Sequence, residues 1–248
     1  MNSAMRSVST GGFHDESSIC AACAVRNSSL CGALSAEELA SLNKISRRKT
    51  LDRGQFHVLE GDIALDFANI VSGVGKLVRG AYDGRTQIVG LLFPSDFIGA
   101  YADGPAGTAE PYSIEAATEL ELCLFPRSQF KVLAQQYPGL EHRLLARTLN
   151  ELQVARDWMV LLGRKTAPEK VATFLLHIGE RMQNQGCTSS EGFDLPLSRS
   201  DIADHIGLTV ETVSRQISNL RKAGVLEIEG ARRISHIDVD ALAAQAGF

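Results

Sequence analysis

The chain has 248 residues, 44% of them hydrophobic and 22% charged, with a formal net charge of -4. This composition is that of an ordinary globular protein, long enough for one large domain or two modest ones with proper cores. It gives no global attraction to nucleic acid, although a local basic face stays open, and no apolar run approaches the roughly 18 residues of a membrane span. We therefore expect a cytoplasmic protein that does not engage a membrane.

Three of the five cysteines lie in the short N-terminal stretch CAACAVRNSSLC, at Cys20, Cys23 and Cys31. In a reducing cytosol, clustered cysteines are more often metal ligands or redox groups than structural disulfides. Soft sulfur donors at close spacing suit iron–sulfur or zinc, and a zinc site could recruit His14. A thiol oxidoreductase that uses Cys20-x-x-Cys23 is a further alternative, but no βαβ context of the thioredoxin type surrounds the motif.

Short apolar runs with turn signals between them extend from about Arg47 to Pro126, including Asp83-Gly84 between two runs. This spacing predicts an antiparallel barrel or roll. In the run ELELCLF, alternation places three leucines on one face and Cys123 on the other. Cys123 is then either a small buried hydrophobe or a thiol available to an overlying N-terminal segment.

Two helices are predicted next, over residues 138–165 and 166–183, the second with Pro168 near its start. In the first helix, apolar or small residues recur at spacings of four, three, four and three. This spacing is typical of a coiled-coil seam between two protomers, although the stripe could instead pack on its own roll. The seam residues are Thr148, Leu152, Ala155, Met159 and Leu162. Cys187, in the loop that follows the second helix, is expected to be an exposed thiol.

The C-terminal pattern predicts a helix-turn-helix followed by a wing. Ser198 caps a helix that runs to about Ile206, Gly207 makes the turn, and Thr209 caps a second helix. The following segment VLEIEGARRISHI predicts a two-stranded wing with Gly230 at its turn.

The second helix of this motif carries Glu211, Ser214 and Arg215 together on the side away from its buried face. Glutamate accepts a hydrogen bond from cytosine and arginine donates two to guanine, so the three residues are candidates for reading DNA bases. The alternative is a solvent-exposed ion pair between Glu211 and Arg215 on an ordinary helix. On the wing, Arg232 and Arg233 are candidates for phosphate contacts.

A β-roll, a long helix and a winged helix-turn-helix with the sequence ETVSRQISNL resemble the Crp/Fnr transcription regulators, and the Glu-x-x-Ser-Arg pattern is similar to that of the Fnr branch. The resemblance implies an α+β fold with a cyclic-nucleotide-binding-like antiparallel β-roll. It also implies an oxygen-labile [4Fe-4S] cluster. Its ligands here would be Cys20, Cys23, Cys31 and Cys123.

The same resemblance divides the chain into four parts: a cysteine segment (1–35), a sensory roll (36–139), a dimerisation helix (140–165) and a winged helix-turn-helix domain (166–248). It implies a homodimer that binds a palindromic operator similar to TTGAT-N4-ATCAA and that contacts RNA polymerase. It implies no enzymatic activity. Regulators of the same fold that sense through zinc, haem or a disulfide remain the alternative.

Two departures within the family are informative. In relatives that bind cyclic AMP, an arginine of the roll meets the phosphate, but the corresponding stretch FIGAYADGPAGTAEPYSIEA contains no arginine. We therefore expect no cyclic nucleotide, because its anionic phosphate would lack a guanidinium partner. In some Fnr relatives the position of Ala155 carries an aspartate, whose charge opposes dimerisation. The alanine therefore predicts a dimer that depends less on the cluster.

Overall fold

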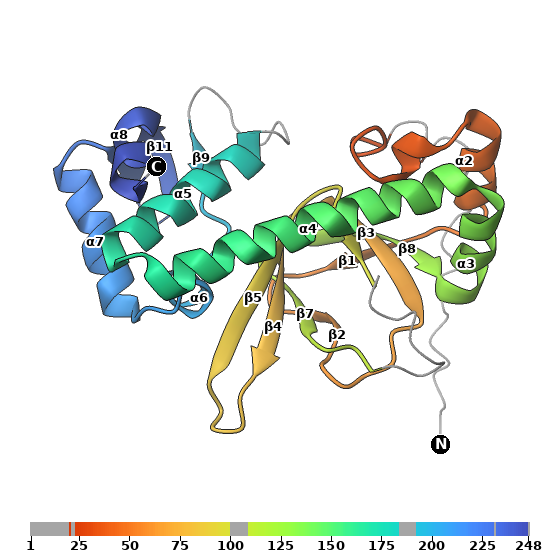
Figure 1. Ribbon diagram of the computed structural model, residues 1–248, viewed down its shortest axis with the longest axis horizontal. Coiled ribbons are helices and arrows are strands. Elements are labelled where there is room, and N and C mark those ends of the chain that lie inside the picture. Colours follow the sequence, from red (N-terminus) through yellow and green to blue (C-terminus); the bar gives the residue numbers. More distant parts are fainter. Residues whose placement is uncertain (1–19, 21–22, 100–108, 184–191, 231, 248) are drawn as a thin grey trace, which may run out of the picture.

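The computed structural model describes residues 20, 23–99, 109–183, 192–230 and 232–247. Figure 1 shows a β-roll and a smaller, mostly helical C-terminal domain, with one long helix, α4, running from the outer end of the roll to that domain. His14 and Cys187 lie outside the described residues, so the expectations for them stay predictions. In the part of the chain that is described, no helix is both long and apolar enough to cross a membrane.

The roll confirms the predicted antiparallel arrangement. Two four-stranded sheets form it, in the orders β1-β8-β3-β6 and β2-β7-β4-β5, and every strand pair in them is antiparallel. The strands are β1 (Arg47–Leu51), β2 (Phe56–Val58), β3 (Asp66–Ser72), β4 (Gly75–Gly80), β5 (Thr86–Leu92), β6 (Phe97–Ile98), β7 (Ser113–Ala116) and β8 (Leu120–Pro126).

Strand β8 packs on both of its faces. Leu120, Leu122 and Leu124 point into the core of the roll, where they are 0%, 0% and 6% exposed. On the other face, Cys123 and Phe125 join a second apolar cluster that includes leucines of the N-terminal segment. The predicted alternation is therefore confirmed, and Cys123 does face an overlying N-terminal segment.

That overlying segment consists of short helices that the sequence patterns did not single out. They are η1 (Leu30–Ala33) and α2 (Ala36–Asn43), while α3 (Arg127–Gln136) follows β8 directly. A reciprocal capping box starts α2, since Ser35 accepts from the backbone N–H of Glu38 and the Glu38 carboxylate accepts from that of Ser35. Leu30, Leu34, Leu39 and Leu42 bury their side chains in one cluster with Phe67, Phe125 and Phe130.

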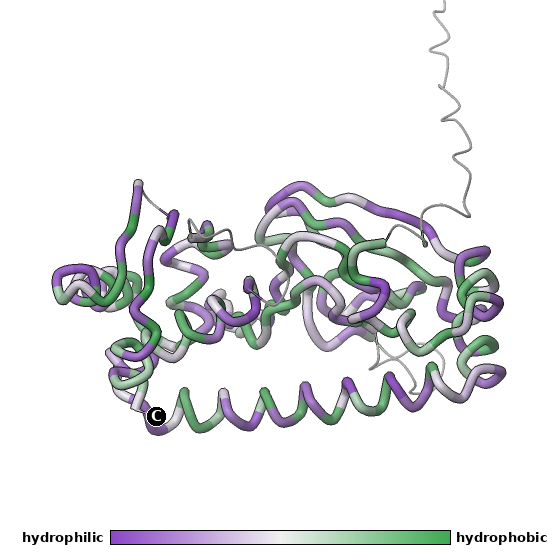
Figure 2. Tube along the Cα trace, turned by 90° about the horizontal axis from the view of Figure 1, so that it is seen from above, coloured by the Kyte–Doolittle hydropathy of each residue, from purple (hydrophilic) through white to green (hydrophobic). Residues whose placement is uncertain are grey.

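The long helix α4 (Pro138–Arg164) and the next helix α5 (Ala167–Gln183) occupy the expected ranges. Leu140 and Leu161 face the rest of the chain and are fully or almost fully buried. Figure 2 shows α4 along the lower edge of the molecule, with no described segment beyond it.

The predicted seam lies on this outer side of α4. Leu152, Met159 and Leu162 are 45%, 72% and 41% exposed, and Ala155 is also exposed. The alternative that the stripe packs on its own roll is therefore wrong. Leu145 and Leu149, which the sequence analysis did not include, extend the stripe towards the start of the helix.

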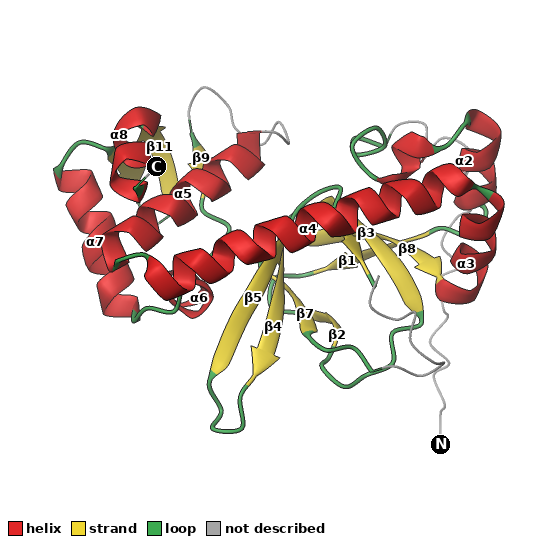
Figure 3. Ribbon diagram, in the orientation of Figure 1, coloured by secondary structure: helices red, strands yellow, loops and turns green. Residues whose placement is uncertain are grey.

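The C-terminal domain contains the predicted helix-turn-helix (Figure 3). The side chains of Ser198 and Thr209 cap α6 (Arg199–Ile206) and α7 (Val210–Lys222), and Gly207 between them has a left-handed backbone with φ of 64°. The wing strands β10 (Leu226–Glu229) and β11 (Arg233–Ile237) pair as predicted, and α8 (Val239–Ala246) follows. A third strand, β9 (Phe193–Asp194), extends the expected two-stranded wing; two residues are too few to show an alternating pattern.

Candidate functional site

The four predicted cysteine ligands line one pocket between the N-terminal segment and the outer face of β8. Cys20, Cys23 and Cys31 come from the segment and Cys123 from the strand. Cys123 is buried and the other three are half-buried. Residues separated by about ninety positions in the chain are thus brought together because β8 turns its leucines inward and its cysteine outward.

Burial controls the chemistry of these thiols. It raises the pKa of Cys20, Cys31 and Cys123, to about 12 for Cys123, because a thiolate is poorly solvated there. The guanidinium of Arg48 opposes part of this shift for Cys20 and Cys123. Without a ligand Cys20, Cys31 and Cys123 therefore stay protonated at neutral pH, and binding a metal or cluster through them must release their protons.

Polar groups that the sequence analysis missed complete the pocket. Arg48 lies opposite Cys123 in the β1–β8 register and forms an ion pair with Glu121 at 3.2 Å. Arg26 and Asn69 also line the pocket, and the Cys20 thiol donates to Asn43 Oδ1 at 2.8 Å. These residues carry no local motif, so only the fold reveals them. The two arginines suit an anionic group held by four thiolates.

The donor set of this pocket consists of four thiols. Among the described residues, no three His, Cys, Asp or Glu side chains are grouped to hold one metal ion. Zinc would draw four sulfurs to about 2.3 Å around one point. In a [4Fe-4S] cluster each cysteine binds a different iron, which spreads the ligands around a larger body. Four thiols around one pocket are the donor set that a [4Fe-4S] cluster requires, and zinc also takes four sulfurs.

The second candidate surface is the outward face of α7. Val213, Ile217 and Leu220 are buried against the domain. Glu211 and Arg215 are exposed and Ser214 is half-buried, so the predicted candidates do share the free side of the helix. Arg215 has no ion pair with Glu211 among the described contacts, where the alternative placed one.

The wing arginines differ from each other. Arg233 lies 3.8 Å from Glu229 across the hairpin, so part of its charge is balanced within the wing. Arg232 is half-buried beside Arg53 and Asp194. Burial lowers the pKa of Arg199, and the nearby charge of Arg232 lowers it further. Both arginines remain candidates for phosphate contacts, with Arg232 the less balanced of the two.

The C-terminal domain docks on the β4–β5 hairpin through an ion-pair network. Lys76 of β4 contacts Glu115 of β7 at 2.8 Å and Asp201 of α6 at 2.9 Å. Burial by itself would lower the pKa of Lys76, but hydrogen bonds to the two carboxylates outweigh it and raise that pKa. Asp201 also closes the capping box of α6, so the same carboxylate starts the helix-turn-helix and anchors it to the roll.

Histidine packing extends this contact. His205 Nδ1 lies 2.9 Å from the carbonyl oxygen of Ile88, and the imidazole lies against Trp158 of α4 with ring centroids 4.3 Å apart. Burial lowers the pKa of His205 to about 4, so the ring is neutral at pH 7. A neutral ring must donate its proton from Nδ1 to that carbonyl. Roll, long helix and C-terminal domain thus meet at one side chain.

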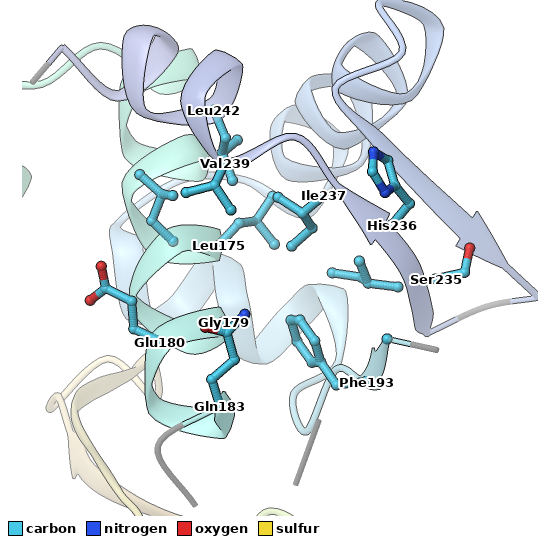
Figure 4. Close-up of a pocket in the computed structure, with 13 residues that line it drawn as sticks. Leu175, Gly179, Glu180, Gln183, Phe193, Ser235, His236, Ile237, Val239 and Leu242 are labelled. Atoms are coloured by element: carbon cyan, nitrogen blue, oxygen red, sulfur yellow. The ribbon is translucent and has the colours of Figure 1, made fainter. Parts of the chain in front are cut away.

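A separate hollow of about 440 Å³ lies between α5, β11 and α8 (Figure 4). Its lining is mainly apolar, with Leu175, Ile237, Val239 and Leu242 converging on it. It is lined by none of the four cysteines and by no residue of α7. We therefore assign it no part in the sites described above.

Two family models match the chain in the same two regions. A model described as a cyclic nucleotide-binding domain matches residues 48–137, and one described as a Crp-like helix-turn-helix domain matches residues 169–245. These matches agree with the roll and with the winged domain. Together with the fold they define the class, a DNA-binding transcription regulator whose roll resembles a cyclic nucleotide-binding domain.

Similar proteins narrow the class. The chain is 42% identical over 232 residues to the transcriptional activator protein FnrL of Cereibacter sphaeroides, covering 92% of each chain. It is 39% identical over 228 residues to the nitrogen fixation regulation protein FixK of Bradyrhizobium diazoefficiens, covering 91% of this chain and 94% of FixK. The structure of FixK2 from Bradyrhizobium japonicum matches with a TM-score of 0.72 and 33% identity, over 81% of this chain and 97% of that one. The chain belongs to the Crp/Fnr family of transcription regulators.

The docking network makes a testable prediction. Lys76→Met keeps the volume of the side chain but leaves Glu115 and Asp201 facing each other without a cation. We expect the free energy of unfolding to fall by roughly 2 kcal/mol, measured from urea unfolding curves. Arg85→Met is the matched control, because it removes the exposed Arg85–Asp83 pair of the same hairpin and is expected to change nothing measurable. Equal unfolding midpoints for the two variants would contradict the role of Lys76.

Proposed function

We propose that this protein is an oxygen-responsive transcription regulator, active in the cytoplasm, in which a [4Fe-4S] cluster held by Cys20, Cys23, Cys31 and Cys123 controls dimerisation and DNA binding. The observation that carries the proposal is the single pocket that all four cysteines line. The relationship to FnrL supports it, since that protein is a transcriptional activator of the same family.

The residues of the pocket have different roles in this proposal. A bound cluster would supply an oxygen-labile bridge between the N-terminal segment and β8. Cys123 provides the fixed end, because its strand is part of the roll core. Cys20, Cys23 and Cys31 provide the end that belongs to the N-terminal segment. Arg48 and Arg26 balance the negative charge of the thiolates and so ease the release of their protons.

The active form of the regulator in this proposal is a dimer bound to DNA. Two copies pair along the exposed stripe of α4, whose spacing is that of a two-stranded seam. Each copy then presents Glu211, Ser214 and Arg215 of α7 to one half of a palindrome similar to TTGAT-N4-ATCAA. Arg232 and Arg233 contact phosphates, and contact with RNA polymerase gives activation. The chain does this without a cyclic nucleotide and without catalysing a reaction.

The first test concerns ligation. Cys20→Ser, Cys23→Ser, Cys31→Ser and Cys123→Ser should each abolish iron and sulfide binding and anaerobic DNA binding, because four thiolates complete the ligand set. The protein is purified without oxygen and its visible absorption, iron and acid-labile sulfide are measured before and after exposure to air. Cys187→Ser is the control and should behave as the wild type.

Two results would count against this assignment. A colourless protein that contains zinc, or that forms a disulfide, would replace the cluster with one of the alternative sensors. Stoichiometric iron and sulfide in Cys123→Ser would remove Cys123 from the ligand set.

The second test concerns base reading. Arg215→Ala should weaken binding to the palindrome by roughly 1–3 kcal/mol and relax selectivity at one base pair, because a bidentate contact to guanine is lost. The exposed position of Arg215 means that the domain should still fold. Arg232→Ala is the comparison: it should weaken all sequences alike and flatten the salt dependence. If binding-site selection returns one consensus for wild type and Arg215→Ala, Arg215 does not read a base.

The third test concerns the seam. Ala155 lies exposed between Leu152 and Met159, so a dimer places two alanines close together. We expect the cluster-free protein to retain a dimer at micromolar concentration, and Ala155→Asp to dissociate it, because two like charges would meet at the seam. Analytical ultracentrifugation measures both. A monomeric cluster-free wild type, indistinguishable from Ala155→Asp, would show that Ala155 does not favour the dimer.

A further inference from the structure

The turn from Phe93 to Asp96 contacts the loop between Cys23 and Cys31, the long helix α4 and helix α5 of the C-terminal domain. Its backbone closes with a hydrogen bond from the N–H of Asp96 to the carbonyl of Phe93 at 2.9 Å, with Pro94 and Ser95 at the centre. Two further backbone bonds, both at 2.9 Å, tie Ser95 and Asp96 to Ile70 of β3. The turn is therefore fixed to the roll next to β8, the strand that carries Cys123.

Ser95 holds a strained backbone in this turn. Its φ is 78°, and it is the one described residue other than glycine with a positive φ. A side chain in this region is sterically strained, whereas glycine would not be. The hydroxyl gives the serine a use, because its Oγ lies 2.6 Å from Oγ of Ser28. Ser28 belongs to the loop between Cys23 and Cys31.

The same loop is also bound to the long helix. Arg143 of α4 donates to the carbonyl of Asn27 at 2.9 Å, and Arg147 donates to the carbonyl of Ser28. The backbone between Cys23 and Cys31 is thus held from two sides, by α4 and by the turn. A change in how the two cysteines are held would move the attachment points of both.

Asp96 continues the connection to the C-terminal domain. Its carboxylate accepts from the N–H of Phe93 at 2.8 Å and pairs with Arg181 of α5 at 2.5 Å. Arg147 approaches the same carboxylate at 3.9 Å. The Asp96 side chain is only 13% exposed, which weakens screening by water. The Arg181 guanidinium also lies over the ring of Phe93, 4.7 Å from its centroid.

We propose that Ser28, Ser95, Asp96 and Arg181 form a relay that transmits the state of the cysteine loop to the DNA-binding domain. These are positioning residues: none of them lines the cysteine pocket or belongs to α7, and each acts through its neighbour. Arg147 adds a branch from the loop and Asp96 to the dimerisation helix. The input of the relay, a change of ligation at Cys23 and Cys31, rests on the proposed function.

Ser95→Gly tests the relay without threatening the fold, because glycine adopts the same φ without strain while the hydroxyl is lost. The measured quantity is the ratio of DNA affinities with and without the cluster. We expect Ser95→Gly and Asp96→Asn each to lower this ratio about tenfold, with iron and sulfide content unchanged. The double variant with Ser28→Ala and Ser95→Gly should lower this ratio no further than either change alone, because both changes remove the same Ser28–Ser95 hydrogen bond.

A second measurement does not need the cluster. In the cluster-free protein, Ser28→Ala should speed hydrogen exchange of the amides of residues 177–183, at the end of α5 that Arg181 holds. Glu180→Gln, which removes a charge from the exposed neighbour of Arg181, is the matched control and should leave that exchange unchanged.

The two measurements separate the relay from the proposed function. A wild type that binds no cluster, but in which Ser28→Ala still speeds exchange in α5, supports the relay and refutes the cluster as its input. An unchanged affinity ratio in Ser95→Gly overturns the relay while the cluster assignment stands. Unchanged exchange in Ser28→Ala overturns it as well.

Discussion

The two-sided packing of β8 is the constraint on which the arrangement of this molecule depends. Its leucines must fill the core of the roll, because that core consists largely of residues from β3, β7 and β8. The alternation of a strand then forces Cys123 and Phe125 outward. An outward apolar face needs a cover, and the leucines of the N-terminal segment provide one. The packing that completes the core therefore also brings Cys20, Cys23 and Cys31 next to Cys123.

Local signals made part of this structure predictable. The caps at Ser198 and Thr209 and the turn at Gly207 define the helix-turn-helix, and each acts within a few residues of its own position. The alternation around Cys123 is equally local. Contacts such as that between Lys76 and Asp201 join residues 125 positions apart, and the local sequence around neither residue indicates its partner. Arg48, Ser95 and Asp96 escaped prediction for the same reason, since only the folded chain gives them neighbours.

The junction between the domains combines two kinds of contact. Lys76 and Asp201 attract each other as ions, and their partial burial strengthens that attraction. His205 contributes as a neutral ring, because a charge at its depth would lack a partner among the described residues. Charge thus fixes the edge of the junction while an uncharged hydrogen bond and aromatic packing fill its centre. Such a junction ties the winged domain to the roll.

The unbroken length of α4 has a mechanical consequence. Its 27 residues span about 40 Å, with the loop between Cys23 and Cys31 attached near one end and the C-terminal domain at the other. For a rod of this length, a rotation of about 5° displaces the far end by about 3.5 Å, close to the rise of one base pair. A movement too small to disturb the packing around the cysteines would therefore shift a recognition helix by a full step along the DNA.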